Sequence, residues 1–402
     1  FPGNFIGTQN TANTNYLSGV HSLYEVGQGV SDGTWPTNYK INQSLRFQNS
    51  TSSYLTRTVG DGNQTTFTVS GWYKKVKSPT TYQNVWSSQT SGSDYFVITI
   101  GDYTVLNESF RIQCYNGTEQ FLIRTSAVHR DYNQWYHFTV AMDTTQPEES
   151  DRAKIYINGE LITEFNNVSY PTQNLDTRVN GTSHNVGTFN TSQQFFDGYI
   201  AEINFIDGLA LDASYFGFTH PTTKKWLPKK YTGEYGAMGY HLDFAGTNTG
   251  TGAVGTVGED KSGNGNHFTS NGIASHDVVP DSPTNNFATF NTTWRNYISG
   301  RTGLPVYKEG NLKADGTGAS DPSDAMTEGT LAVPISGKWY FEVVTYGDTM
   351  VGWGVPFEGA ASDAPGYNTR GFGLHKDGYV KYNSLDFITT GLGNISYSGQ
   401  IV

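Results

Sequence analysis

The stretch Trp135–Ile162, WYHFTVAMDTTQPEESDRAKIYINGELI, decides the fold expected for the whole chain. Along Tyr136–Met142 every second side chain is strongly apolar, which is the period of a β-strand with one buried face. Residues 143–152 are polar and contain a proline, so we expect an exposed loop. Asn158-Gly159 then joins two short strands, because both residues tolerate the positive φ of a type I′ turn. Strand, loop and hairpin in this order predict an antiparallel β-sandwich.

The composition of the 402 residues favours short strands and turns over long helices. Glycine (47), tyrosine (26) and phenylalanine (23) are abundant, whereas charged residues make up only 15% of the chain. No window of about 18 apolar residues occurs, so we expect no membrane insertion. The net charge of −11 argues against nucleic acid as a partner, because its phosphates are also negative. The single cysteine, Cys114, cannot form an intrachain disulfide and is expected to pack as a small apolar side chain.

The strand pattern continues on both sides of the opening stretch. It recurs at Ser44–Phe47 and Thr66–Lys75, and further short strands follow up to residue 125. Residues 195–211, FFDGYIAEINFIDGLAL, close this first unit. Strict alternation in that segment predicts one face with Ile200, Glu202, Asn204 and Ile206, and an opposite face with Tyr199, Ala201, Ile203 and Phe205.

Five of these motifs follow one another in a characteristic order: SLRF, FTVSGWYK, WYHFTVAMD, KIYINGELI and FDGYIAEINFIDGLAL. Their succession resembles laminin-G/concanavalin A-like jelly-roll domains over residues 43–212, and it leaves residues 1–42 as an irregular N-terminal lead-in. The resemblance implies two antiparallel sheets in which the first and last strands pair. We therefore expect Ser44–Phe47 to lie beside Tyr199–Phe205.

Residues 213–328 are rich in glycine and asparagine and are expected to form a connector or a small β module. The combination of FDGYIAEINFIDG, WLPKKYTGEYG, DKSGNGNHF and DSPTNNFATFN resembles large structural proteins of marine tailed bacteriophages. Tail fibres and other virion-surface fibres are the members it resembles most. This resemblance covers about residues 195–290 and suggests a biological context without suggesting a chemistry.

Residues 329–402 show a third pattern, which includes GKWYFEVVTYGDTMVGWG. It resembles the opening half of a SPRY-type β-sandwich, in which GKWYFEV and VGWG would lie on adjacent core strands. Asp377-Gly378 is expected to form another hairpin turn. The resemblance implies further strands beyond Val402, so we expect this sandwich to be incomplete. The predicted fold class is all-β, with tandem antiparallel β-sandwiches: a concanavalin A-like jelly roll and then a SPRY-like sandwich.

The catalytic motifs in the sequence do not fit their expected contexts. The GxGxxG match at 250–255 is followed by a glycine-rich segment that cannot open the helix needed for dinucleotide binding. Glu202 to Asp207 faintly resembles the catalytic strand of concanavalin-type glycoside hydrolases, which need two carboxylates about 5 Å apart. Asn204 replaces the central carboxylate, and alternation turns Asp207 away from Glu202. The HExxH motif is absent and no GxSxG nucleophile elbow is recognised, so we predict that the protein is not an enzyme.

Calcium is the metal ion that this fold class would accommodate. The resemblance to laminin-G domains implies a site at a rim, built from loop carboxylates and backbone carbonyls. Four loop residues are candidate ligands: Asp143, Asp151, Asp260 and Asn264. Asx-turns would also explain why these residues occur in loops, and the spacing of the four residues does not decide between a calcium site and Asx-turns.

Sugar binding is the function that the resemblance implies most directly. A sugar site needs a stacking aromatic side chain together with a few amide or carboxylate groups. Five aromatic residues are candidates: Trp35, Trp86, Tyr95, Trp294 and Trp353. Burial in the sandwich core is the competing explanation for each of them.

Taken together, the sequence leads to the hypothesis of a non-enzymatic virion structural protein, a tail fibre or capsid-attached fibre on the virion surface outside the cell. Its partners would be other virion proteins and a host surface glycan or protein, and homotrimers are the assembly expected of a fibre. One alternative is a purely structural virion subunit that packs against its neighbours. Others are a secreted bacterial lectin or adhesin and, least favoured, a depolymerase.

Overall fold

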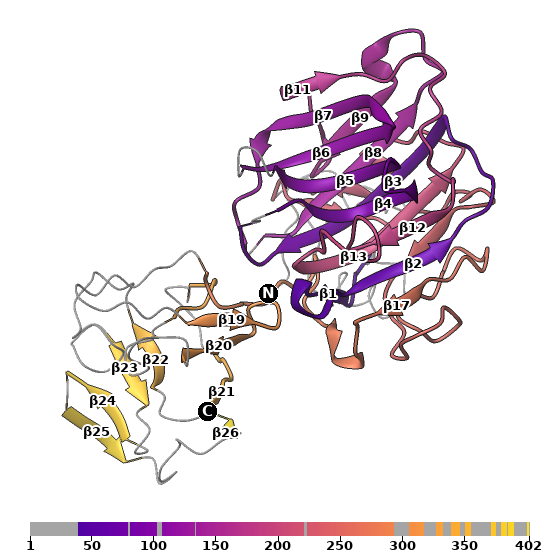
Figure 1. Ribbon diagram of the computed structural model, residues 1–402. Coiled ribbons are helices and arrows are strands. Elements are labelled where there is room, and N and C mark those ends of the chain that lie inside the picture. The colour runs from indigo at the N-terminus through magenta and orange to yellow at the C-terminus, as the bar shows by residue number, and fades with distance from the viewer. Residues whose placement is uncertain are drawn as a thin grey trace, which may run out of the picture.

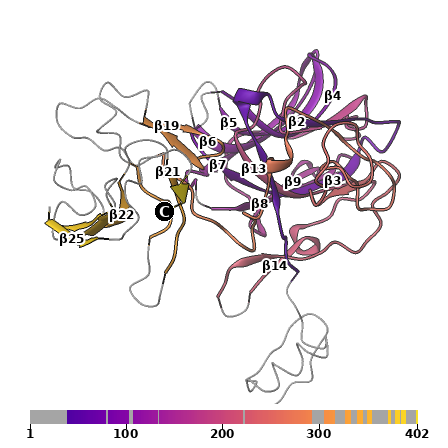
Figure 2. The ribbon, with the colours of Figure 1, turned by 90° about the horizontal axis from the view of Figure 1, so that it is seen from below.

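The computed structural model describes residues 39–78, 81–102, 107–132, 134–220 and 223–292, and shorter C-terminal segments at 305–316, 327–332, 339–345, 350–354, 371–374, 379–383, 385–389 and 400–401. Two antiparallel eight-stranded sheets stack on each other in the N-terminal part (Figure 1), and Figure 2 shows the two layers from below. The predicted all-β fold class with antiparallel sheets is therefore confirmed. No helix among the described residues is long and apolar enough to cross a membrane.

Each sheet is built from strands that are distant in the sequence. Sheet one has the order β10 (Glu160–Leu161), β9 (Ala153–Ile157), β8 (Tyr136–Asp143), β3 (Thr66–Lys75), β13 (Gly198–Asp207), β1 (Ser44–Phe47) and β18 (Val278–Val279), with β16 (Tyr240–Leu242) also paired to β13. Sheet two has the order β11 (Phe165–Ser169), β7 (Thr118–Val128), β6 (Asn107–Asn116), β5 (Asp94–Asp102), β4 (Gln83–Ser91), β12 (Ser183–Val186), β2 (Tyr54–Thr58) and β17 (Thr269–Asn271).

The opening stretch forms β8, β9 and β10, and its turn has the predicted geometry. Asn158 and Gly159 have φ angles of 49° and 85°, as a type I′ turn requires. The apolar residues of β8 enter the core between the sheets. The polar face of β8 is also buried, contrary to the expectation of a single buried face, because the hairpin of β14 (Gly217–Thr219) and β15 (Trp226–Pro228) lies on it (Figure 2). Sheet one is therefore covered on both faces here.

The pairing of the first and last strands is confirmed. β1 lies antiparallel to β13, with Leu45 opposite Ile200 and Phe47 opposite Gly198. The predicted alternation along β13 is wrong from Glu202 onward. Ile200 packs in the same core cluster as Ile203 and Phe205, because the pairing of β13 with β3 shifts between residues 201 and 204. Glu202 has a φ of 54°, so a β-bulge at this residue moves every later side chain to the opposite face.

The segment expected to be a connector or a small β module contributes to both sheets. β16 pairs with β13 and β18 pairs with β1 in sheet one, while β17 pairs with β2 in sheet two. These strands are only two or three residues long, too short for their periodicity to be recognised in the sequence. The sandwich therefore extends well beyond residue 212.

Residues 277–287 and 309–311, which we call the outer strap, are bonded to the outer face of sheet one. Asp277 pairs with Arg46 at 2.8 Å and Asp281 pairs with Lys74 at 2.9 Å. The hydroxyl of Tyr199 donates to the carbonyl of Gly310 at 2.6 Å. The DSPTNNF motif thus serves in this structure to hold late parts of the chain against early strands.

The described residues after 328 also form antiparallel β structure. β22 (Val351–Gly354), β23 (Gly371–Leu374), β24 (Tyr379–Tyr382) and β25 (Leu385–Thr389) make one sheet, and β21 (Val344–Thr345) pairs with β26 (Gln400–Ile401). The turn expected at Asp377-Gly378 lies outside the described residues. The resemblance of this part to a SPRY-type sandwich stays a prediction.

Candidate functional site: a polar hollow on β2 and β17

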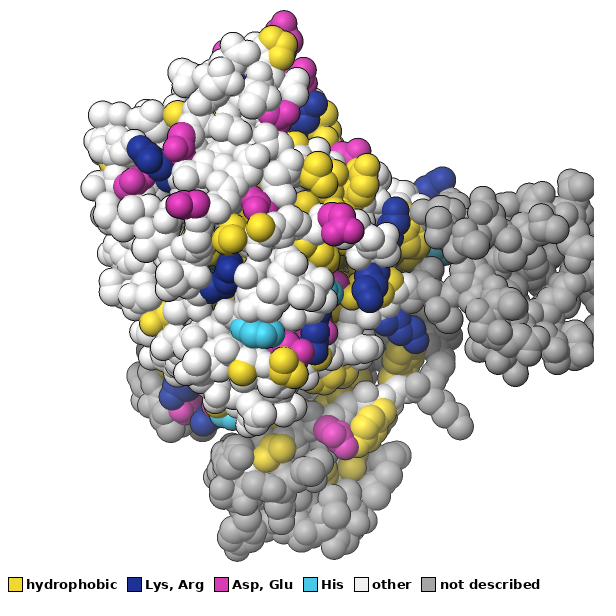
Figure 3. Space-filling view, turned by 90° about the vertical axis from the view of Figure 1, so that its right-hand side faces the viewer, with side chains coloured by type: hydrophobic (Ala, Val, Ile, Leu, Met, Phe, Trp, Pro, Cys, Tyr) yellow, Lys and Arg dark blue, Asp and Glu magenta, His cyan; other side chains and the backbone are white. Residues whose placement is uncertain are grey.

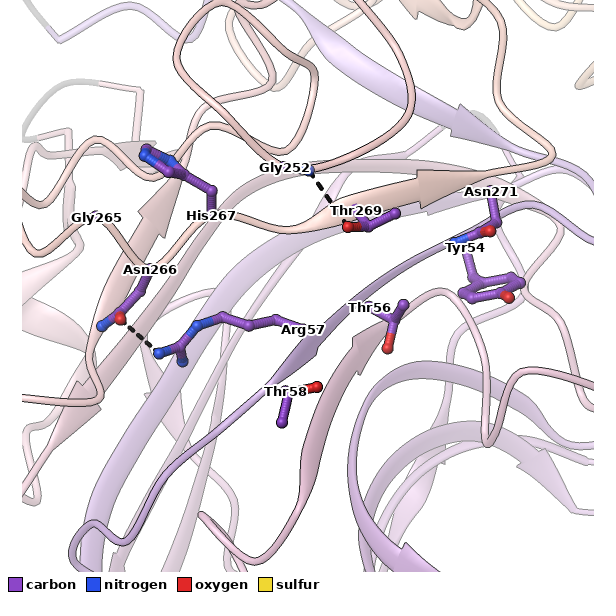
Figure 4. Close-up of a pocket in the computed structure, with 10 residues that line it drawn as sticks. All are labelled: Tyr54, Thr56, Arg57, Thr58, Gly252, Gly265, Asn266, His267, Thr269 and Asn271. Atoms are coloured by element: carbon purple, nitrogen blue, oxygen red, sulfur yellow. Dashed lines mark hydrogen bonds between the residues drawn. The ribbon is translucent and has the colours of Figure 1, made fainter.

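A hollow of about 490 Å³ opens beside the edge of sheet two (Figure 4). β17 pairs with β2 only along Tyr54–Thr56, whereas β2 continues to Thr58. The space is lined by these two strands and by the loops that precede β17. Its described lining residues are Tyr54, Thr56, Arg57, Thr58, Gly252, Gly265, Asn266, His267, Thr269 and Asn271.

Arg57 supplies the charge of the hollow. Its Nη2 donates to the side-chain oxygen of Asn266, which holds the guanidinium at one end of the hollow (Figure 4). The other terminal nitrogen, Nη1, is buried and has no hydrogen-bond partner among the described residues. Burial lowers the pKa of Arg57, but an arginine stays charged near neutral pH.

The neighbouring polar groups are held in place by the loops. The Asn266 amide donates to the carbonyls of Ala237 and Gly239 at 3.0 and 2.8 Å, so its oxygen is turned toward Arg57. Nδ1 of His267 accepts from the backbone N–H of Asp260 at 3.0 Å. An accepting Nδ1 leaves the proton of a neutral imidazole on Nε2, which is then a donor.

The opposite end of the hollow is aromatic. Tyr54 lies there beside Asn271 (Figure 4), and its ring centroid is 6.1 Å from that of Phe195. Thr56 and Thr58 occupy the positions between Tyr54 and the end of the strand. The hollow therefore combines one aromatic ring with a row of hydroxyl, amide and cationic groups. Such a set can stack on an apolar ring face and hydrogen-bond to hydroxyls around it.

Of the five aromatic residues proposed from the sequence, the three that the structure describes, Trp86, Tyr95 and Trp353, do not line this hollow. Trp86 is fully buried and donates from Nε1 to the hydroxyl of Tyr240 at 2.7 Å, so it belongs to the core. The ring of Tyr95 stacks on Tyr115 at 5.4 Å, on sheet two. Trp353 is 42% exposed in the C-terminal part. Trp35 and Trp294 lie outside the described residues.

Two of the residues proposed as calcium ligands line a second hollow, of about 320 Å³. Asp143 accepts from the Thr145 hydroxyl and from Nε2 of Gln146, both at 2.6 Å. Burial would raise the pKa of Asp143, but these hydrogen bonds outweigh burial and lower the pKa below its usual value. Asp151 instead pairs with Lys154 at 2.9 Å. Protein donors therefore occupy both carboxylates.

The other two proposed ligands stabilise the loop before β17. The carboxylate of Asp260 accepts from the backbone N–H groups of His241, Ser262 and Asn266 at 2.8 to 2.9 Å. The side-chain amide of Asn264 donates to two backbone carbonyls. The bond from Ser262 to Asp260 is an Asx-turn contact, whereas Asn264 connects this loop to Gly236 and Gly239. Within the described ranges there is no cluster of three or more His, Cys, Asp or Glu side chains that could hold a metal ion, and calcium stays a prediction.

Glu202 lies in a buried network on the outer face of sheet one. Its Oε1 accepts from the hydroxyl of Tyr39 at 2.6 Å and from Nε2 of His241 at 2.8 Å. Asp207 is engaged elsewhere, with the backbone N–H of Asn63 and the amide of Asn180. The carboxylate of Glu202 therefore links β13 to β16, and it is not paired with Asp207 across a cleft.

The pKa of His241 lies above its usual value because of this network. Burial alone would lower that pKa, but the hydrogen bond to Glu202 and the negative charge of Glu202 outweigh burial. A raised folded-state pKa stabilises the protein fully below the unfolded-state value of about 6.5, and this stabilisation is lost as pH rises through the folded-state value.

We therefore expect Glu202→Gln to lower the free energy of unfolding more in mild acid than in base. Urea unfolding of the wild type and the variant at about pH 5.5, 7 and 9 measures the difference. The gap between the two proteins should be widest at the lowest of these pH values and should narrow as pH rises. A gap that does not change with pH would contradict the coupling of Glu202 to His241.

Residues 49–214 match the Laminin_G_3 family model, described as the concanavalin A-like lectin/glucanases superfamily. The sandwich thus contains a concanavalin A-like superfamily domain, as the order of its motifs implied. β2 lies within the matched residues, whereas β17 and the loops before it lie beyond them. No curated protein sequence matches the chain.

Several solved structures are similar to this chain at low identity. A proposed carbohydrate-binding protein from Bacteroides ovatus is 19% identical, with 59% of this chain and 60% of that chain covered and a TM-score of 0.39. For the SAP-like pentraxin of Limulus polyphemus the identity is 15%, the coverages are 43% and 79%, and the TM-score is 0.32. The enzymatically active domain of tailspike protein 2 from bacteriophage CBA120 is 14% identical, with 44% of this chain and 27% of that chain covered and a TM-score of 0.31. With TM-scores below 0.5, these likenesses carry no argument about function.

Proposed function

We propose that this lectin-like β-sandwich binds carbohydrate, without cleaving it, at the hollow on β2 and β17. The observation that carries the proposal is the lining itself, which combines the Tyr54 ring with hydroxyl, amide and guanidinium groups. Sugars present both apolar ring faces and hydroxyl groups, so a shallow site of this composition suits them. The matched superfamily includes lectins, which is consistent with this assignment. It also includes glucanases, but the buried bonding of Glu202 gives no support to hydrolysis.

The surface supports recognition by short-range contacts. Over most of the face shown in Figure 3, acidic and basic side chains are scattered among uncharged groups and form no large patch of one sign, although several basic ones lie close together along its right-hand side. Long-range attraction of a highly charged macromolecule would need such a patch. Hydrogen bonding within a local hollow has no such requirement.

Replacing Tyr54 with alanine is expected to weaken glycan binding about tenfold, because the stacking surface of the hollow is lost. A glycan array would first identify a ligand, and calorimetric titration would then compare the wild type with the variant. The control is Tyr215→Ala, since Tyr215 is a partly exposed tyrosine that does not line the hollow. Equal affinities for Tyr54→Ala and the wild type, or the absence of any bound glycan, would contradict the proposal.

We further propose that the chain is a subunit of a virion-surface fibre of a tailed bacteriophage. This proposal is supported only by the sequence resemblance over about residues 195–290. Its partners would be other virion proteins and a host surface glycan, and trimers would increase weak individual affinities through multivalency. The mass of the intact protein in solution tests the assembly, and a monomer would contradict a trimeric fibre. A trimer that binds no glycan would instead favour a purely structural virion subunit, and a glycan-binding monomer a secreted lectin or adhesin.

A further inference from the structure

The hollow on β2 and β17 has an unbalanced charge. Among its described lining residues there is no aspartate and no glutamate, and Arg57 is the permanently charged member. The chain as a whole is acidic, with a net charge of −11. The hollow is therefore a locally cationic place on an anionic protein.

Two buried cations of sheet one have carboxylate partners. Arg46 pairs with Asp277 and Lys74 pairs with Asp281, in both cases at less than 3 Å. Arg57 has a different environment, because its partner is the neutral amide oxygen of Asn266. A guanidinium nitrogen that is buried without a partner, as Nη1 is, costs free energy that an incoming acceptor would recover.

One carboxylate near this arginine, that of Asp260, is hydrogen-bonded to other groups. Asp260 is close enough to raise the pKa of Arg57, although burial dominates and lowers that pKa overall. Both oxygens of Asp260 accept hydrogen bonds from its own loop and from the backbone N–H of His241. Asp260 therefore makes no ion pair with Arg57, and the guanidinium can still bond to a ligand at the hollow.

We propose that the hollow selects saccharides that carry a negative group, a carboxylate or a sulfate, and that Arg57 is the residue that recognises this group. The proposal rests on the carbohydrate function proposed above and names its ligand class. A charge-assisted hydrogen bond from the guanidinium to an anionic oxygen is stronger than one to a hydroxyl. Tyr54, at the opposite end of the hollow, would contact a sugar ring.

The test compares acidic oligosaccharides with neutral copies of themselves. Uronate oligosaccharides are paired with their carboxyl-reduced forms, and sulfated oligosaccharides with their desulfated forms. We expect at least one acidic member to bind the wild type about tenfold more tightly than its neutral counterpart, and added salt to weaken only the acidic one. The two pairs distinguish a carboxylate from a sulfate as the recognised group.

Arg57→Gln provides the second arm. This variant should bind the acidic and neutral members of a pair with nearly equal affinity, while Arg57→Lys should keep part of the preference. The matched control is Lys154→Gln, which removes a cation from the second hollow and should keep the full preference. Melting temperatures show whether each variant is folded.

The outcomes separate the two proposals. Equal binding of acidic and neutral members by the wild type would overturn the acidic preference and leave carbohydrate binding intact. Absence of binding by every oligosaccharide would overturn both. A wild-type preference that persists in folded Arg57→Gln would overturn the role of Arg57.

Discussion

Replacing Asp281 with alanine is expected to lower the free energy of unfolding of the sandwich by about 3–5 kcal/mol. The carboxylate of Asp281 accepts from Nζ of Lys74 at 2.9 Å and from Nε1 of Trp135 at 3.0 Å. The side chain of Lys74 is completely buried. Without Asp281, the ammonium would keep only neutral oxygen acceptors, those of Asn286 and Phe287, and its charge would be uncompensated.

Urea unfolding followed by tryptophan fluorescence would measure this loss. Asp151→Ala is the matched control, because it removes a carboxylate that pairs with Lys154 at the same distance of 2.9 Å but on the surface. Exposed pairs contribute less than about 1 kcal/mol, so the control should change stability little. Similar losses in the two variants would show that the outer strap does not depend on the buried ion pair.

The second large effect is expected for Trp86→Ala, which should lower the free energy of unfolding by about 3–5 kcal/mol. Trp86 is fully buried, and its ring packs against Phe96 and Phe205 at centroid distances of 6.1 and 5.8 Å. Alanine would leave a cavity and would remove the hydrogen bond to Tyr240. Thermal or urea unfolding measures the change.

A second variant of Trp86 distinguishes burial in the core from contact with a sugar, the two roles that the sequence leaves open for this residue. Trp86→Phe keeps most of the buried surface, so the protein should fold and bind glycan as the wild type does. Loss of glycan binding in this folded variant would show that Trp86 contacts the ligand. Tyr215→Ala, at a side chain that is 47% exposed, should cost much less stability than Trp86→Ala.

The parts of the fold that depend on neighbouring residues could be predicted from the sequence. The hairpin at Asn158-Gly159 follows from two residues that tolerate positive φ, and both adopt it. The pairing of Ser44–Phe47 with β13 followed from the resemblance of the motif order to a known family, since spacing alone does not determine which distant strands meet. Local backbone preference and family resemblance thus account for the correct predictions.

Features that depend on one residue or on distant contacts escaped prediction. The bulge at Glu202 reverses the faces of β13, yet the sequence GYIAEINFID contains no glycine or proline at that point to indicate it. Arg57 and Asn266, which meet in the hollow, are 209 positions apart. Residue type alone does not show which aromatic side chain lines a hollow, so Tyr54 could not be identified from the sequence. Its strand could be recognised, but its place beside β17 depends on a three-residue strand without a detectable period.

The outer strap has a consequence for synthesis of the chain on the ribosome. Ser44 and Lys74 emerge early, but their bonding partner Asp281 is made more than 200 residues later. Until then, the edge of β1 that later pairs with β18 and the ammonium of Lys74 lack their native partners. Unpaired strand edges readily associate with other chains, and contacts between distant residues form slowly. A nascent chain of this protein therefore has to be kept apart from its neighbours until about residue 290 has left the exit tunnel, and only then can the sandwich be completed.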